Sequence, residues 1–68
     1  MQITLNGQKK EIAENLTVQA LVAELDLEKT ALVAELNGVI LRQEDWAKIR
    51  LQENDKLELI KFCGGGQY

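Results

Sequence analysis

The chain has 68 residues, of which 46% are apolar and 28% are charged, and it contains no histidine. A chain of this length forms one domain with a small core and has little room for a deep active-site cleft. The absence of histidine removes the usual general base near neutral pH and the commonest nitrogen ligand of zinc. We therefore expect neither an enzyme nor a metal site.

Charge and hydropathy also limit the partners and the location of the chain. The formal net charge of -3 argues against nucleic acid, which calls for a basic patch, and favours a partner with a basic surface. No apolar run approaches the roughly 20 residues of a membrane span, and the N-terminal residues lack the order of a signal peptide. The single cysteine, Cys63, cannot form an internal disulfide. These features predict a cytoplasmic protein that binds neither nucleic acid nor membrane.

The first third of the chain predicts a hairpin followed by one helix. Ile3 and Leu5 alternate with polar residues, which is the pattern of a half-buried strand. Asn6-Gly7 tolerates positive φ, so we expect a tight turn that leads into a second strand over residues 8–13. Thr17 stands at an N-cap position and is followed by apolar residues at helical spacing, which predicts a helix of about ten residues. These apolar residues are Val18, Leu21, Val22 and Leu25.

The remainder of the chain predicts further strands. Residues 31–42 contain two apolar runs around Asn37-Gly38, a second tight-turn signal, and residues 43–46 form a polar turn or a single helical turn. The last apolar segment, residues 56–62, is apolar on both faces, and a strand of that kind is usually central. Leu57 and Leu59 lie on one face, and Ile60 and Phe62 lie on the other.

This order of elements predicts an α+β fold of the β-grasp, or ubiquitin-like, type. A mixed sheet of four or five strands carries one main helix on one face, with the N-terminal and C-terminal strands side by side. We expect a β-grasp domain over residues 1–63 and a flexible tail over residues 64–68. The tail holds Gly64, Gly65 and Gly66, which have the most conformational freedom to lose on ordering.

Several residues of the second half of the chain stand at a characteristic spacing. They are Leu36, Asn37, Gly38, Arg42, Trp46, Asp55, Gly65 and Gly66. Their order is a Leu-Asn-Gly turn, a short apolar run, an arginine, a tryptophan, an acidic turn and a last strand that runs into Gly-Gly. This pattern resembles the ThiS family, the sulfur carriers of thiamin biosynthesis. Two departures are Leu41, where the family often has proline, and Gln67-Tyr68, which lie beyond the usual end.

The resemblance implies a carrier that needs no cofactor of its own. An E1-like activating enzyme uses ATP to adenylate the terminal glycine, here Gly66, and sulfur from a persulfide then replaces AMP to give a thiocarboxylate. The sulfur passes to an acceptor enzyme such as thiazole synthase, or to synthesis of a sulfur amino acid. Gly64 and Gly65 would thread into the partner, and Ile60 and Phe62 would form the partner-binding face.

The extension after Gly66 bears on this chemistry, because an amide carbonyl cannot be adenylated as an acid. We therefore expect a protease, such as a JAMM-type zinc metalloprotease, to remove Gln67 and Tyr68. The alternative interpretation is that Gln67 and Tyr68 are a harmless read-through without a function.

Two other classes of function stay open on the sequence alone. One is a ubiquitin-like modifier that forms isopeptide bonds, and the other is a non-covalent β-grasp interaction module with an inert tail. Trp46 is interpreted as a packing residue, and Cys63 as the end of the last strand and not as a reactive thiol.

Overall fold

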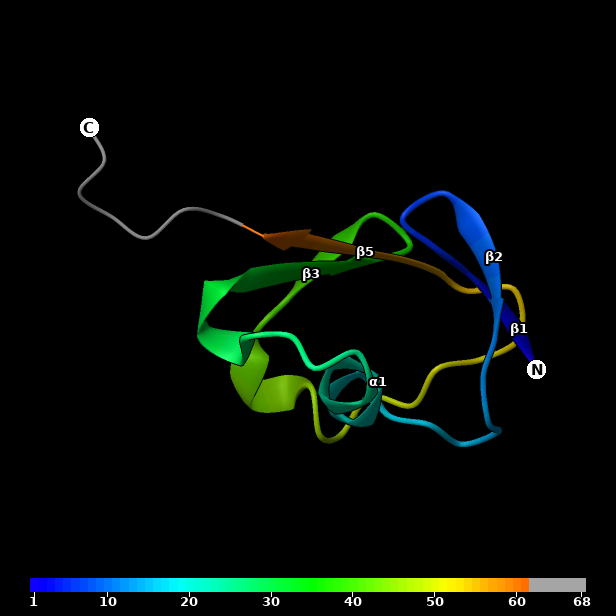
Figure 1. Cartoon of the computed structure of the whole chain (residues 1–68), viewed down its shortest axis with the longest axis horizontal. Helices are drawn as coiled ribbons and strands as arrows, with labels where there is room; N and C mark the ends of the chain where they lie inside the picture. Colours follow the sequence, from blue (N-terminus) through cyan, green and yellow to red (C-terminus); the bar gives the residue numbers. More distant parts are fainter. Residues whose placement is uncertain (62–68) are drawn as a thin grey trace.

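The computed structural model describes residues 1–61, which form a five-stranded sheet with one α-helix against one face (Figure 1). The elements in chain order are β1 (Gln2–Leu5), β2 (Gln8–Glu11), α1 (Val18–Glu24), the 3₁₀ helix η1 (Lys29–Ala31), β3 (Leu32–Leu36), β4 (Val39–Leu41), the 3₁₀ helix η2 (Gln43–Asp45) and β5 (Lys56–Lys61). The predicted order and the predicted β-grasp fold are confirmed. The predicted domain boundary at residue 63 and the tail over residues 64–68 lie outside the described residues.

The sheet has the order β2-β1-β5-β3-β4, so β5 is its central strand. β1 pairs with β5 in parallel, with Thr4 opposite Lys56 and Leu5 opposite Leu57. β3 pairs with β5 in antiparallel fashion along the whole length of β3. The expected neighbours, the first strand and the last, therefore lie side by side, although about 50 residues of chain separate them.

Helix α1 begins as the sequence predicts. Thr17 is the N-cap, and its Oγ1 accepts a hydrogen bond from the backbone N–H of Ala20 at 3.1 Å, which satisfies one of the free donors of the first turn. The prediction of about ten residues is wrong, because the helix ends at Glu24. Asp26 follows with a φ of 57°, and a residue in the left-handed region ends an α-helix. Leu25 is the C-cap and still packs against the core.

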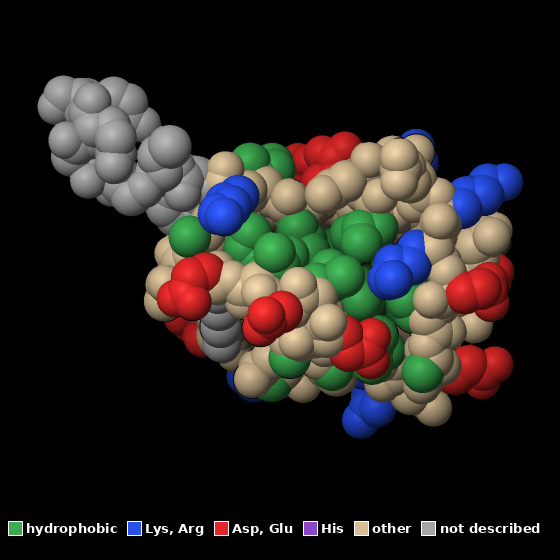
Figure 2. All heavy atoms as spheres, in the orientation of Figure 1, with side chains coloured by type: hydrophobic (Ala, Val, Ile, Leu, Met, Phe, Trp, Pro, Cys, Tyr) green, Lys and Arg blue, Asp and Glu red, His purple; other side chains and the backbone are tan. Residues whose placement is uncertain are grey.

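The core lies between the sheet and α1, where Figure 2 shows hydrophobic side chains gathered with charged ones around them. Trp46 contributes the largest fully buried side chain. The backbone N–H of Gln19 donates to the carbonyl oxygen of Trp46 at 3.2 Å, so the segment after η2 lies against the first turn of the helix. The interpretation of Trp46 as a packing residue is confirmed. The buried residues are Ile3, Ile12, Val18, Leu21, Val22, Leu32, Ala34, Trp46, Leu51, Leu57 and Leu59.

Among residues 1–61, no helix is long and apolar enough to cross a membrane.

The burial of Trp46 predicts a large loss of stability when the indole is removed. We expect Trp46→Ala to lower the free energy of unfolding by about 3–5 kcal/mol, because the small core cannot collapse around the cavity that is left. Urea unfolding followed by far-ultraviolet circular dichroism measures the change. Trp46→Phe is the matched control, since it keeps an aromatic ring in the site and should lose less. An alanine variant as stable as the wild type would contradict the placement of Trp46 in the core.

Candidate functional site

Sequence reasoning placed the site at the end of the last strand and in the tail beyond it. β5 is described as far as Lys61, and it ends on the side of the molecule away from the N-terminus (Figure 1). Several residues of the predicted site lie outside the described residues: Gly64, Gly65 and Gly66, the extension Gln67-Tyr68, and Phe62 of the partner face. The described part of the site is therefore the end of β5 and the sheet face around it.

β5 separates its apolar side chains between two faces, as the sequence predicts. Leu57 and Leu59 point into the core, with 0% and 7% of their surfaces exposed. Ile60 lies on the opposite face and is 50% exposed, because successive residues of a strand point to opposite sides of the sheet. That opposite face is called the open face here, since α1 covers the other one.

Two further apolar side chains lie on the open face beside Ile60. Val33 of β3 is directly opposite Ile60 in the sheet register, and Ile40 of β4 is opposite Glu35, the next open-face residue of β3. Ile40 is 68% exposed and Val33 is half-buried. Directly opposite and diagonal neighbours on one face of a sheet are close enough to make one surface. Val33, Ile40 and Ile60 are called the open-face patch below.

Sequence reasoning missed Val33 and Ile40. Residues 32–36 are apolar at every position except Glu35, so the sequence carries no clear alternation to show that Val33 lies on the side opposite Leu32 and Ala34. The tight turn then fixes the register that sets Ile40 opposite Glu35.

Two acidic residues lie next to the open-face patch. Glu35 of β3 and Glu58 of β5 are directly opposite each other on the open face. Like charges in this arrangement repel, and neither carboxylate makes an ion pair within residues 1–61. An arginine or lysine from another molecule would remove this repulsion.

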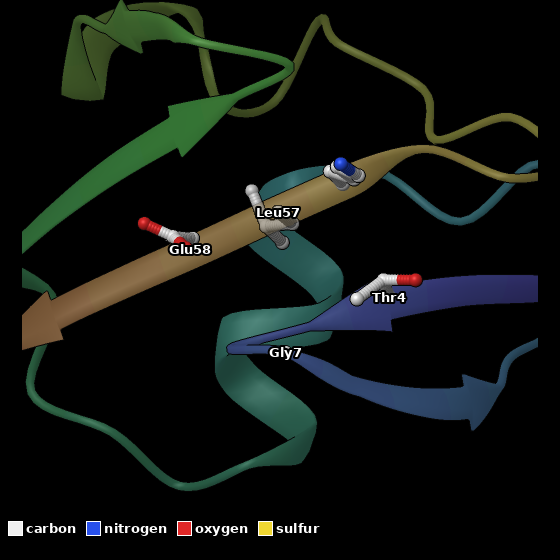
Figure 3. Close-up of a pocket in the computed structure, with 5 residues that line it drawn as sticks. Thr4, Gly7, Leu57 and Glu58 are labelled. Atoms are coloured by element: carbon white, nitrogen blue, oxygen red, sulfur yellow. The ribbon is translucent and has the colours of Figure 1, made fainter.

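A hollow of about 310 Å³ lies on the open face where β1 and β5 diverge (Figure 3). It is lined by Thr4, Gly7, Lys56, Leu57 and Glu58. The hollow forms because β1 ends at Leu5 while β5 continues to Lys61.

The polar residues of the family pattern have structural roles in the described fold. Asn37 donates from Nδ2 to Oδ1 of Asp55 at 3.0 Å, and Asp55 accepts at Oδ2 from the backbone N–H of Gln52 at 2.8 Å. This network ties the β3–β4 turn to the turn that precedes β5. Arg42 is exposed and pairs with Glu44. Besides the glycines, the pattern therefore contains residues that hold the beginning of β5 in place, namely Asn37 and Asp55.

A mixed five-stranded sheet with parallel first and last strands and a single helix on one face defines the chain as a ubiquitin-like β-grasp domain. A sequence model of the ThiS family matches residues 3–66. The chain belongs to the ThiS family, and it is a ThiS-type sulfur carrier. This assignment agrees with the expectation of a carrier and not of a catalyst.

Curated relatives include both separate carriers and segments of larger proteins. The chain is 32% identical over 66 residues to the sulfur carrier protein ThiS of Escherichia coli, covering 97% of this chain and 100% of that protein. It is also 32% identical over 66 residues to a thiazole synthase of Paramagnetospirillum magneticum, covering 97% of this chain and 20% of that protein. The chain thus spans about a fifth of the length of that relative.

The fold has a solved counterpart of similar sequence. The crystal structure of the thiamine biosynthesis protein ThiS from Geobacter metallireducens superposes with a TM-score of 0.85 at 32% identity. The match covers 97% of this chain and 100% of that one.

The separation of Ile60 from Leu59 predicts opposite effects of the same substitution. We expect Ile60→Lys to leave the melting temperature almost unchanged, because the lysine side chain can reach water from the open face. Leu59→Lys should unfold the domain, because it places a charge without a partner in the core. Thermal unfolding of the two variants under the same conditions measures the difference. A similar loss of stability in both variants would contradict the placement of Ile60 on a solvent-exposed face of the sheet.

Proposed function

We propose that this chain carries sulfur in thiamin biosynthesis as a thiocarboxylate on Gly66. The observation that carries the proposal is the match to the ThiS family, which extends through the glycine run and ends at residue 66. A glycine suits this position because it has no Cβ to obstruct the approach of a reagent to its carbonyl carbon.

The chemistry belongs to the partner enzymes and the carrier supplies the carboxylate. An E1-like enzyme joins the Gly66 carboxylate to the AMP portion of ATP and releases pyrophosphate. The outer sulfur of a persulfide then attacks the same carbon and AMP leaves. A thiol cleaves the S–S bond of the resulting acyl disulfide, which releases the thiocarboxylate and leaves a disulfide. The thiocarboxylate passes its sulfur to an acceptor, for which thiazole synthase is the leading candidate. Two relatives named thiazole synthase contain a segment similar to this chain, which supports a functional connection between the two activities.

Processing must come before adenylation in this scheme. The carbonyl of Gly66 is bonded to the nitrogen of Gln67 in the sequence, and an amide has no carboxylate to attack ATP. We propose that a protease, such as a JAMM-type metalloprotease, cleaves after Gly66. Cleavage then acts as the activation step of the carrier.

The open-face patch is proposed as the surface that the activating enzyme contacts, together with Phe62. An apolar surface next to the working end of a small acidic domain is typical of a partner site. Because Glu35 and Glu58 lie beside the patch, the contact surface of the enzyme is expected to combine apolar residues with at least one basic side chain.

The function is tested by giving an E1-like enzyme the full-length chain and, separately, a version that ends at Gly66. We expect pyrophosphate release from ATP only with the version that ends at Gly66. With a sulfur source added, the intact mass of that version should increase by the difference between one sulfur and one oxygen atom. Equal pyrophosphate release from both forms without a protease would contradict the processing step. No mass increase with an active enzyme would contradict the carrier function.

The partner face is tested by charge substitutions on both sides of Lys61. We expect Phe62→Asp and Ile60→Asp each to weaken binding of the activating enzyme by tenfold or more. Loss of an apolar interface anchor typically costs about 2 kcal/mol of binding free energy, which is more than a tenfold change in the dissociation constant. Titration calorimetry measures the dissociation constant, and Val39→Asp is a control for the added charge because Val39 is exposed but lies one residue out of phase with Ile40. Unchanged affinity in both variants would exclude this face, and a large fall in melting temperature for Phe62→Asp would place Phe62 in the core.

A further inference from the structure

Both Asn-Gly turns of the chain reach the central strand through their asparagine side chains. Asn6 and Asn37 have φ values of 49° and 52°, and the glycine after each also has positive φ. This backbone is the one expected for a two-residue hairpin turn. The sequence predicts the turns, but the contacts of the two side chains with β5 are an additional feature.

Asn37 binds the beginning of β5. The backbone N–H of Lys56, the first residue of the strand, donates to Oδ1 of Asn37 at 2.9 Å, and the backbone N–H of Asn37 donates to the carbonyl oxygen of Lys56 at 2.8 Å. Asn37 approaches β5 from the side of β3 and β4.

Asn6 binds β5 near its end and from the other edge. The backbone N–H of Leu59 donates to Oδ1 of Asn6 at 2.8 Å, and Nδ2 of Asn6 donates to the carbonyl oxygen of Leu59 at 3.4 Å. The backbone N–H of Asn6 also donates to the carbonyl oxygen of Leu57 at 3.0 Å. The side chain of Asn6 thus takes the place that the next residue of a longer β1 would occupy.

The Asn6 side chain replaces a strand at the point where β5 no longer has β1 as a neighbour. β1 ends at Leu5 and turns away at Gly7, while β5 continues (Figure 3). Beyond Leu57, the edge of β5 that faces β1 would otherwise have only water as a partner. Leu59 stands two residues before Lys61, after which the chain runs through Phe62 and Cys63 into the glycines.

We propose that Asn6 is a positioning residue for the reaction at the C-terminal glycine. Its amide fixes the end of β5 against β1 and thereby fixes the direction in which the chain leaves the sheet. This inference rests on the proposed function, since it concerns the delivery of Gly66 to the activating enzyme.

The physical reason is the twist of a strand pair. Two strands without a third neighbour twist more strongly than strands within a sheet, and the end of β5 would have only β3 as a partner without Asn6. The bonds from Asn6 to Leu59 attach the end of β5 on the edge opposite β3. Fixing the departure point in advance lowers the cost of ordering the chain when it binds. Loss of Asn6 should therefore affect binding of the carrier and not the chemical step.

The test uses asparagine-to-glycine substitutions, because glycine adopts positive φ without strain and keeps each turn. Asn6→Gly removes both side-chain bonds to Leu59. Asn37→Gly is the matched control, because it removes the side-chain bonds to Lys56, at the other end of β5, and to Asp55 before it, far from the working end. Asn15→Gly controls for the substitution itself, since Asn15 is exposed, has a φ of 64° and makes no side-chain hydrogen bond within residues 1–61.

The first measurement is amide hydrogen exchange of the full-length chain, which requires no partner. We expect Asn6→Gly to speed exchange of the Leu59 amide by at least tenfold relative to Lys56, and Asn37→Gly to have the reverse effect. Unchanged Leu59 exchange in Asn6→Gly would overturn the inference, whatever the function of the chain.

The second measurement is steady-state adenylation, with whichever of the full-length chain and the version ending at Gly66 the enzyme accepts. We expect Asn6→Gly to raise the KM for the carrier roughly three- to tenfold, the equivalent of one or two net hydrogen bonds, with kcat unchanged. Asn37→Gly and Asn15→Gly should keep the wild-type KM.

The outcomes separate this inference from the proposed function. If the enzyme adenylates neither wild-type form, the proposed function fails, and hydrogen exchange alone decides whether Asn6 holds the end of β5. If wild type is adenylated and Asn6→Gly and Asn37→Gly raise KM equally, Asn6 has only a structural role and the inference is wrong.

Discussion

The parallel pairing of β1 with β5 is the constraint on which the rest of this fold depends. It places the last described strand in the centre of the sheet, where β1 covers one edge and β3 the other. Leu57 and Leu59 can then enter the core beneath α1, and Ile60 must point to the open face. Because the pairing extends over only two residue pairs, side chains from neighbouring turns complete the hold on β5. The strand that leads to the glycines is therefore hydrogen-bonded along both edges, to β1 on one side and to β3 on the other.

The sequence predicted those features that depend on local patterns. Asn-Gly pairs, an N-cap threonine and period-2 alternation act within a few residues, and they located the hairpins, the start of α1 and the two faces of β5 correctly. The helix length was wrong because Leu25 continues the apolar spacing, while Asp26 already has the left-handed backbone that ends the helix. The spacing of apolar residues does not indicate where the backbone changes to the left-handed conformation.

Features that depend on tertiary register could not be predicted in the same way. The runs around Asn37-Gly38 are apolar at nearly every position, so alternation does not show which side of β4 faces the helix, and Ile40 was overlooked. The contact of Asn6 with Leu59 joins residues 53 positions apart, and it exists only because β1 is shorter than β5. The open-face patch and the asparagine contacts both arise from the arrangement of strands, which residue types alone do not reveal.

The central position of β5 also determines when the fold can form. Every other element of the described structure precedes β5 along the chain, so during translation the two hairpins and the helix have no common sheet until β5 leaves the ribosome. Pairings between residues so far apart in sequence are made late and slowly. The sheet of this domain is consequently completed only after the strand that leads to the glycines has been synthesised.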